Sequence, residues 1–107
     1  MPGSNSDFED TVALVTGSSR GIGAATARLL GERGADVVVN YNSSADAADT
    51  VVDYIRTAEG EGDAIAIQAD VRVRDDVDTM VAETESTFGT VDVLVNNANM
   101  SFPFKPF

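Results

Sequence analysis

A short glycine-rich segment holds the residues of this chain that are best suited to chemistry. Residues 16–23 read Thr-Gly-Ser-Ser-Arg-Gly-Ile-Gly and follow an apolar run at residues 12–15. Gly17 permits a sharp turn, Gly21 lets an anion approach the backbone, and Gly23 allows a helix to pack closely against the preceding strand. The first turn of such a helix offers free N–H groups and a positive dipole end to a phosphate. The pattern predicts a pyrophosphate site for a dinucleotide, with a tight turn that binds nothing as the alternative.

The end of the next apolar run bears on which dinucleotide is bound. In NAD sites an acidic residue at this position normally binds the ribose hydroxyls. Here residues 40–43 read Asn-Tyr-Asn-Ser, and Asp36 lies too early in the run to serve. Without a carboxylate a 2′-phosphate is not repelled, and Arg20 can pair with it. We therefore expect NADP(H) rather than NAD(H), with a solvent-exposed Arg20 that binds no ligand as the alternative.

Polar residues also stand where the third and fourth apolar runs end. Asp70 and Val71 follow the run at residues 64–69, and Asn-Asn-Ala-Asn occupies residues 96–99. Open parallel sheets bind ligands beyond the carboxyl ends of their strands, at the point where the strand order reverses. Asp70 can meet an adenine ring there or cap the following turn. The asparagines can face the ligand or hydrogen-bond within their own turn.

Apolar periodicity along the chain predicts strands and helices in alternation. Ser43 or Ser44 can cap the second helix, which Gly60 and Gly62 then end. The expected strands are residues 12–16, 35–41, 64–69 and 91–96; the expected helices are residues 21–31, a segment with apolar positions from Ala48 to Ala58, and residues 74–88, with Val77, Met80, Val81, Thr84 and Phe88 on one face.

This alternation indicates an α/β fold with a parallel sheet, whose apolar strands are covered on both faces. Right-handed crossovers place the first two helices on one face and the third on the other, with strand order 3-2-1-4. The prediction is thus a Rossmann-like, partial doubly wound sheet with three helices. We expect a flexible arm at residues 1–10, a dinucleotide-binding half-domain at residues 11–100 and a loop tail at residues 101–107.

Length and composition describe one small, acidic globular domain. Across 107 residues, 18 acidic and 7 basic side chains give a net charge of −11. This charge argues against nucleic acid or an anionic membrane as a partner. The chain has no cysteine and no histidine, which excludes disulfides and removes the commonest metal ligand and general base. No signal peptide or membrane span is expected, and the predicted location is cytoplasmic.

Taken together, the glycine segment, Asp70-Val71 and residues 94–98 resemble the short-chain dehydrogenase/reductase family, nearest to its 3-oxoacyl-acyl-carrier-protein reductase branch. The resemblance covers about residues 10–100 and implies an NAD(P)(H)-dependent oxidoreductase with a Rossmann sheet. It also implies roles for single residues. Ser19, Arg20 and Ile22 would line the pyrophosphate; Asn40, Tyr41, Asn42 and Ser43 would meet the adenosine phosphate; Asp70 and Val71 would hold the adenine; Asn97 and Ala98 would flank the ribose.

The chain departs from the family pattern in two respects. Asn99 replaces a glycine beside the ribose, and the family's catalytic serine, Tyr-x-x-x-Lys pair and helical asparagine have no counterpart in these residues. Neither tyrosine substitutes, since Tyr41 and Tyr54 are each followed four positions later by alanine, and Lys105 sits between prolines. We therefore expect a chain that is truncated relative to the family and catalytically inactive alone.

The complete form would reduce a 3-oxoacyl-like carbonyl with NADP(H). We expect the fourth strand to be an open edge that self-associates or pairs with a complementing second chain. The alternatives are a non-catalytic dinucleotide-binding or interaction module and a remnant without function.

Overall fold

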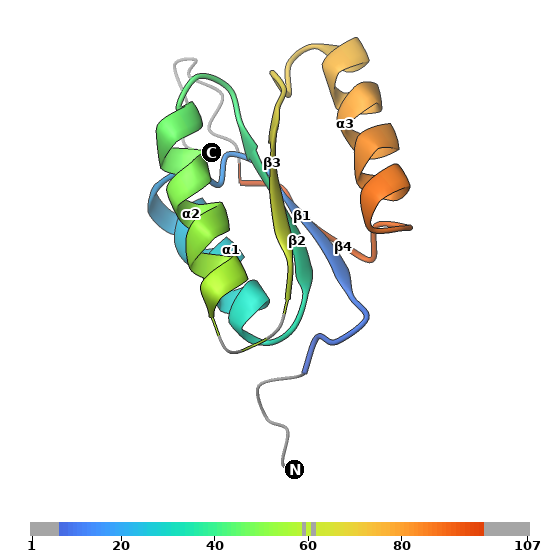
Figure 1. Cartoon of the computed structure of the whole chain (residues 1–107). Helices are drawn as coiled ribbons and strands as arrows, with labels where there is room; N and C mark the ends of the chain where they lie inside the picture. Colours follow the sequence, from blue (N-terminus) through green and yellow to red (C-terminus); the bar gives the residue numbers. More distant parts are fainter. Residues whose placement is uncertain (1–6, 59, 61, 98–107) are drawn as a thin grey trace, which may run out of the picture.

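In the computed structural model, residues 7–58, 60 and 62–97 are described, and they form an alternating series of strands and helices (Figure 1). The predicted tail at residues 101–107 lies outside the described residues. The strands are β1 (Val12–Val15), β2 (Asp36–Tyr41), β3 (Ala64–Gln68) and β4 (Val93–Val95), and the helices are α1 (Gly21–Glu32), α2 (Ala45–Thr57) and α3 (Arg74–Thr87).

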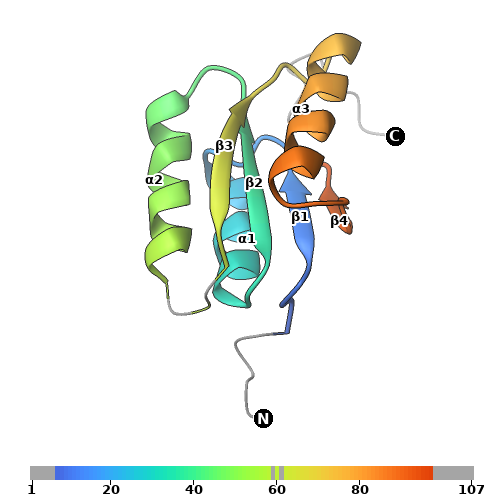
Figure 2. The same cartoon turned by 45° about the vertical axis from the view of Figure 1, so that its right-hand side comes forward.

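All strand pairs are parallel, and the sheet order is β3-β2-β1-β4, which confirms the predicted topology. The first two crossovers move outward from β1 to β3, and the third returns to the other side of β1. Because crossovers of this kind are right-handed, the return places α3 on the opposite face from α1 and α2 (Figure 2). The strand order therefore reverses between β1 and β4, where ligands bind in such sheets.

The face under α1 and α2 carries the larger core. Alternate strand residues point to opposite faces, so Ala13, Val15, Val37 and Val39 meet the helices on this side. Ile55 of α2 is fully buried and packs over Gly31 of α1. The other buried residues of this core are Ala24, Ala27, Leu30, Ala35, Ala48, Val51, Val52 and Ala64.

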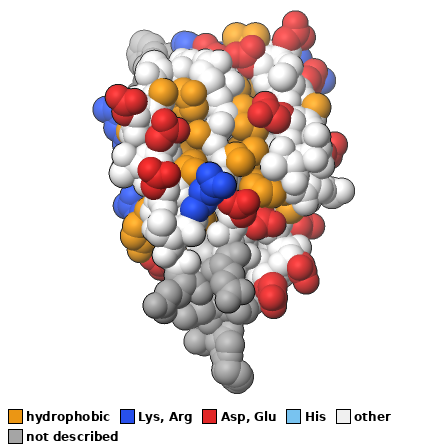
Figure 3. Space-filling view, in the orientation of Figure 1, with side chains coloured by type: hydrophobic (Ala, Val, Ile, Leu, Met, Phe, Trp, Pro, Cys, Tyr) orange, Lys and Arg blue, Asp and Glu red, His pale blue; other side chains and the backbone are white. Residues whose placement is uncertain are grey.

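The opposite face has a smaller core, because α3 alone covers it. Its buried residues are Leu14, Val38, Ile67, Ala69 and Met80. On the predicted apolar face of α3, Met80 and Thr84 are buried, while Val81 and Phe88 are only partly covered. Acidic side chains are scattered over the surface and interleaved with apolar ones, as Figure 3 shows for one side of the molecule.

Several element boundaries differ from the sequence prediction. β4 is shorter than residues 91–96, and α2 ends at Thr57, before the glycines expected to end it. Ser44 occupies the N-cap position of α2 but makes no side-chain capping bond.

The predicted arm also differs where it is described. Within residues 7–10, Phe8 N donates to Arg33 O at 2.8 Å, and Asp7 pairs with the Arg33 guanidinium. The described part of the predicted arm is therefore bonded to the end of α1 and is not free. Among the described residues, no helix is long and apolar enough to cross a membrane.

Candidate functional site

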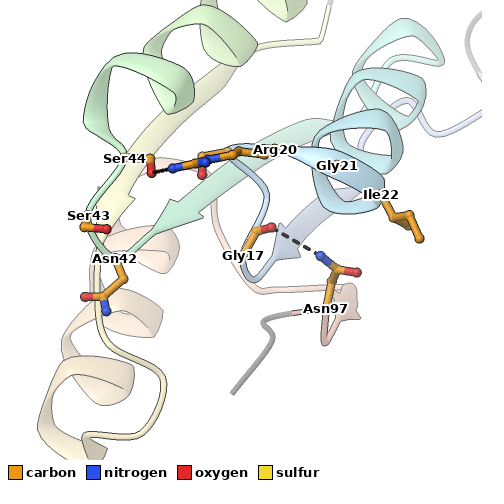
Figure 4. Close-up of a pocket in the computed structure, with 9 residues that line it drawn as sticks. Gly17, Arg20, Gly21, Ile22, Asn42, Ser43, Ser44 and Asn97 are labelled. Carbon is orange, nitrogen blue, oxygen red and sulfur yellow. Dashed lines mark hydrogen bonds between the residues drawn. The ribbon is translucent and has the colours of Figure 1, made fainter. Parts of the chain in front are cut away.

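A pocket of about 830 Å³ opens at the carboxyl end of the sheet, between the start of α1 and the loop after β2 (Figure 4). Three segments that are distant in sequence meet there: the β1–α1 turn, the β2–α2 loop and the end of β4. Its lining residues are Gly17, Ser19, Arg20, Gly21, Ile22, Asn42, Ser43, Ser44 and Asn97. All except Ser44 belong to the site that the sequence predicted.

The glycine turn has the backbone geometry that its sequence predicts. Gly17 and Gly21 have φ values of 60° and 61°, in the left-handed region that favours glycine. Gly23 is buried, and a Cβ atom there would collide with the carbonyl oxygen of Gly17. The turn and the first turn of α1 are thus packed too closely for a side chain at Gly23. This close approach fits the role expected of the third glycine in a pyrophosphate turn.

The start of α1 is electrostatically suited to an anion. Arg20 stands at the N-cap position without a side-chain capping bond, and the first turn contains no acidic residue. The first backbone N–H groups of a helix lack partners within the helix, and the dipole adds positive potential there. Among the described residues, none that lines the pocket carries a carboxylate. The local field therefore favours a phosphate in spite of the chain's net negative charge.

Arg20 connects the two sides of the pocket. Its guanidinium Nη2 donates to the hydroxyl Oγ of Ser44 at 2.5 Å, and Figure 4 shows the side chain lying across toward the β2–α2 loop. Asn42 and Ser43 line the same side of the pocket, and both are exposed. The sequence prediction ended the site at Ser43 and gave Ser44 only a possible capping role. A second serine directly after a predicted pocket residue was the signal that could have included Ser44.

The structure places Asn40 differently from the prediction, which put it against the adenosine phosphate. Asn40 is 2% exposed, and its side-chain amide links the glycine turn to the end of β3. Its Oδ1 accepts a hydrogen bond from Gly17 N at 3.0 Å, and its Nδ2 donates to the carbonyls of Ile67 and Ala69. A buried amide is stable only when its polar atoms are bonded in this way. Asn40 therefore supports the glycine turn from behind the pocket.

Ser18 completes this support, although the sequence analysis did not assign it a role. The fully buried Ser18 hydroxyl donates to Val15 O at 2.7 Å and accepts from Asn40 N at 3.1 Å. Ser18 N in turn donates to Asn40 O. The turn is thus fixed to β2 by a closed set of hydrogen bonds, which positions its backbone amides without a ligand.

Asn97 attaches the end of β4 to the same turn. Its Nδ2 donates to Gly17 O at 3.2 Å, which Figure 4 shows as a dashed line. Its backbone N–H donates to the Thr16 hydroxyl at 2.9 Å. Asn97 therefore lies at the predicted site with its amide directed at the turn. Ala98 and Asn99, which the sequence also assigned to the site, lie outside the described residues.

The predicted adenine residues do not line this pocket. Asp70 makes a two-pronged ion pair with Arg72, through Arg72 Nε at 3.0 Å and Nη2 at 2.9 Å. The side-chain bonds from Arg72, joined by its backbone N–H, hold the pKa of Asp70 below its ordinary value. Val71 lines a second, apolar hollow beside α3. Tyr41 is half-buried and packs against the core under α1 and α2.

Comparison with known proteins identifies the family. Residues 11–107 match the family model described as short chain dehydrogenase. The chain belongs to the short-chain dehydrogenase family. It is 54% identical over 90 residues to a 3-oxoacyl-[acyl-carrier-protein] reductase from Synechocystis sp., which covers 84% of this chain and 36% of the relative.

Two further members of the family are informative. A short chain dehydrogenase from Burkholderia cenocepacia, solved in complex with NADP, superimposes with a TM-score of 0.81 and 45% identity, covering 87% of this chain and 37% of that one. A short-chain dehydrogenase/reductase homolog from Bacillus subtilis, YusS, is 48% identical over 84% of this chain, which spans 81% of that relative. The chain therefore spans little more than a third of the reductase, but most of this shorter relative.

Proposed function

We propose that this chain is the NADP(H)-binding half of a carbonyl reductase. The observation that carries the proposal is the position of Arg20, which crosses the pocket between the α1 N-terminus and the serines after β2, where the described lining residues include no carboxylate. A guanidinium binds a phosphate in two-pronged fashion, whereas an NAD site would need an acidic group for the ribose hydroxyls. The NADP complex of the Burkholderia relative supports the same choice of cofactor.

The two sides of the pocket would bind different parts of the cofactor. Backbone N–H groups at the start of α1 would bind the pyrophosphate, with Ser19 and Ile22 beside it. The 2′-phosphate would be bound by Arg20, Ser43 and Ser44. When bound, the reduced nicotinamide supplies a hydride to a carbonyl carbon. Adenine contact by Asp70 and Val71, and ribose contact by Asn97, Ala98 and Asn99, stay predictions.

The reaction of the complete protein would be reduction of a 3-oxoacyl-like carbonyl. The 54% identity to a 3-oxoacyl-[acyl-carrier-protein] reductase supports this substrate class. Hydride transfer to a carbonyl also needs a proton donor with a suitable pKa. The side chains lining the described pocket are serine, asparagine, arginine and isoleucine, none of which is such a donor. We therefore expect the chain alone to bind cofactor without turnover.

A non-catalytic dinucleotide-binding or interaction module is the second candidate. The relative YusS supports it, because the segment that matches this chain makes up 81% of that protein. In either case we expect β4 to pair with a further copy or a complementing chain, since β4 pairs with β1 alone among the described strands. A remnant without function is the outcome if no cofactor binds. The cytoplasmic location also stays a prediction.

Calorimetric titration of Arg20→Ala with NADP⁺ and NAD⁺ tests the proposal. Hydrogen bonds to charged groups contribute about 1.5–3 kcal/mol, so the variant should lose about 10- to 100-fold in NADP⁺ affinity. NAD⁺ affinity should change little, because NAD⁺ has no 2′-phosphate. Arg28→Ala is the matched control: Arg28 lies on the same helix, over the Tyr54 ring and away from the pocket.

Three results would contradict the proposal. If NADP⁺ does not bind at millimolar concentration, the chain is better described as a remnant without function. Equal affinity of the wild-type chain for NAD⁺ and NADP⁺ would remove the specificity assigned to Arg20. Oxidation of NADPH by the chain alone, with a simple ketoester as substrate, would refute the expected inactivity.

A further inference from the structure

Gln68, the last residue of β3, holds the first residue of the β2–α2 loop. Its side-chain Nε2 donates to the backbone carbonyl oxygen of Asn42 at 3.1 Å and to the side-chain Oδ1 of Asn42 at 3.2 Å. Gln68 pairs in register with Tyr41, so it lies beside the point where β2 ends and the loop begins. The sequence analysis assigned no role to Gln68.

The two contacts fix the orientation of both side-chain amides. A backbone carbonyl can only accept a hydrogen bond, so Gln68 must present its NH₂ group, which has two N–H donors, to Asn42. The second donor then requires the side-chain oxygen of Asn42, rather than its nitrogen, to face Gln68. Both oxygen acceptors of Asn42 are therefore held toward β3.

This orientation matters because Asn42 lines the cofactor pocket together with Ser43 and Ser44. Figure 4 shows the Asn42 side chain extending away from the contact between Arg20 and Ser44. An amide oxygen turned the other way would compete with a ligand for the N–H and O–H donors on this side of the pocket. With both oxygens held by Gln68, the guanidinium and the serine hydroxyls stay available to a phosphate.

The two forms of the cofactor need different partners at this position. The ribose hydroxyls of NAD are normally bound by an acidic acceptor, whereas the oxygens of a 2′-phosphate accept hydrogen bonds and need donors. The Arg20 guanidinium and the hydroxyls of Ser43 and Ser44 can supply such donors. Turning the Asn42 oxygens toward β3 makes this side of the pocket richer in donors, which favours the 2′-phosphate over free hydroxyls.

We infer that Gln68 is a positioning residue for cofactor selectivity, which favours NADP(H) over NAD(H) by holding both oxygens of Asn42 toward β3. This inference rests on the proposed function, because it concerns the side of the pocket assigned to the 2′-phosphate. Gln68 is exposed and is not among the described residues that line the pocket. Its influence on the cofactor therefore passes through Asn42 and requires no contact of its own.

Calorimetric titration of Gln68→Met with NADP⁺ and NAD⁺ tests the inference. Methionine is similar in length but has no N–H donor, so Asn42 is free to turn its Oδ1 into the pocket. We expect the NADP⁺ affinity to fall about 3- to 10-fold, as for one hydrogen bond, and the NAD⁺ affinity to stay within about twofold. Arg56→Met is the matched control, because Arg56 pairs with Asp63 just before the start of β3, at the other end of this strand.

A double-mutant cycle separates positioning from general damage to the loop. Asn42→Ala has no side-chain oxygen to turn, so we expect it to keep the preference for NADP⁺. Adding Gln68→Met to Asn42→Ala should then change the ratio of the two affinities by less than about twofold. An equal effect of Gln68→Met in both backgrounds would overturn the inference, as would a parallel loss of affinity for both cofactors.

The remaining outcomes distinguish this inference from the proposed function. If Asn42→Ala loses NADP⁺ affinity as strongly as Arg20→Ala, the Asn42 amide itself binds the phosphate and the inference is wrong. A wild-type preference for NADP⁺ that Gln68→Met leaves intact would count against positioning alone. A wild-type chain without any preference for NADP⁺ would count against the proposed function instead.

Discussion

The same strands form both faces of the sheet, but helices cover the two faces to different extents. Leu14 and Leu94 are register partners on the α3 face, yet Leu14 is 3% exposed and Leu94 is 62% exposed. On the other face, α1 and α2 bury Val15, Val37 and Val39 completely. The strands carry apolar residues for two covered faces, but only one face receives two helices in the described residues.

The pocket at the carboxyl end of the sheet is well formed although the α3 face is only partly covered. The glycine turn leads into α1, and its hydrogen bonds reach Asn40 of β2 and Asn97 after β4. These hydrogen bonds do not involve the apolar hollow beside α3. The glycine turn can therefore be held in place while Leu94 stays exposed on the α3 face.

The largest expected effect compares one buried side chain from each face. Ile55→Ala should lower the free energy of unfolding by about 3–5 kcal/mol, because a closed core cannot collapse around the cavity. Met80→Ala removes a comparable volume, but Met80 borders the apolar hollow beside α3. We therefore expect this variant to lose about 2 kcal/mol of unfolding free energy. Urea unfolding followed by circular dichroism measures both. Equal losses would show that the α3 face is as tightly packed as its opposite.

The next comparison concerns two glycines of the turn. A Cβ at Gly23 would collide with Gly17 O, whereas a Cβ at Gly21 has no neighbour within 4 Å and only an unfavourable φ of 61°. Gly23→Ala should therefore cost about 1–3 kcal/mol and abolish NADP⁺ binding. Gly21→Ala should cost about 1–2 kcal/mol. Thermal melts and calorimetry on both variants test this order, and a better-folded, cofactor-binding Gly23→Ala would refute it.

A smaller effect is expected on the open face. Leu94→Lys should change stability by no more than about 0.5 kcal/mol, because the side chain is already largely exposed. It should also reduce binding of an apolar dye such as 1-anilinonaphthalene-8-sulfonate. Fluorescence titration measures the change. Tyr54→Lys is the control, because Tyr54 is 44% exposed on α2, on the opposite face of the sheet. A large loss of stability in Leu94→Lys would mean that Leu94 is buried in solution.

The smallest expected effect is the pH response of Asp70. Arg72 lowers the Asp70 pKa in the folded chain, so this pair stabilises the fold above the unfolded value of about 3.9. The contribution is lost as the pH falls through the folded pKa. NMR titration should show the Asp70 pKa rising toward its ordinary value in Arg72→Ala, with Arg74→Ala as control. An unchanged Asp70 titration would mean that the ion pair does not persist in solution.

Much of the architecture could be predicted from the sequence, because its causes are local. Short apolar runs mark the strands, and the crossover rule converts their succession into the order β3-β2-β1-β4. Boundaries were less predictable. The sequence predicted a strand over residues 91–96, but only Val93–Val95 pair in register with β1.

The roles of single polar residues were harder to predict. Asn40 and Ser43 lie three positions apart in a polar stretch, yet one is buried beneath the glycine turn and the other is exposed in the pocket. The difference follows from the register of β2 between β1 and β3, which brings Asn40 within reach of Gly17 and Ala69. Ser44 was missed for a related reason, since Arg20 reaches it only after the β1–α1 turn and the β2–α2 loop meet.

The sequence by itself determined the glycine turn, the parallel sheet and the family, because each depends on residue type and spacing along a short stretch. Only the tertiary structure decided which polar side chains support the turn and which face the pocket. It also decided that Leu94 is exposed while its partner Leu14 is buried. Burial depends on which helices cover a strand, and those helices come from segments that lie elsewhere in the chain.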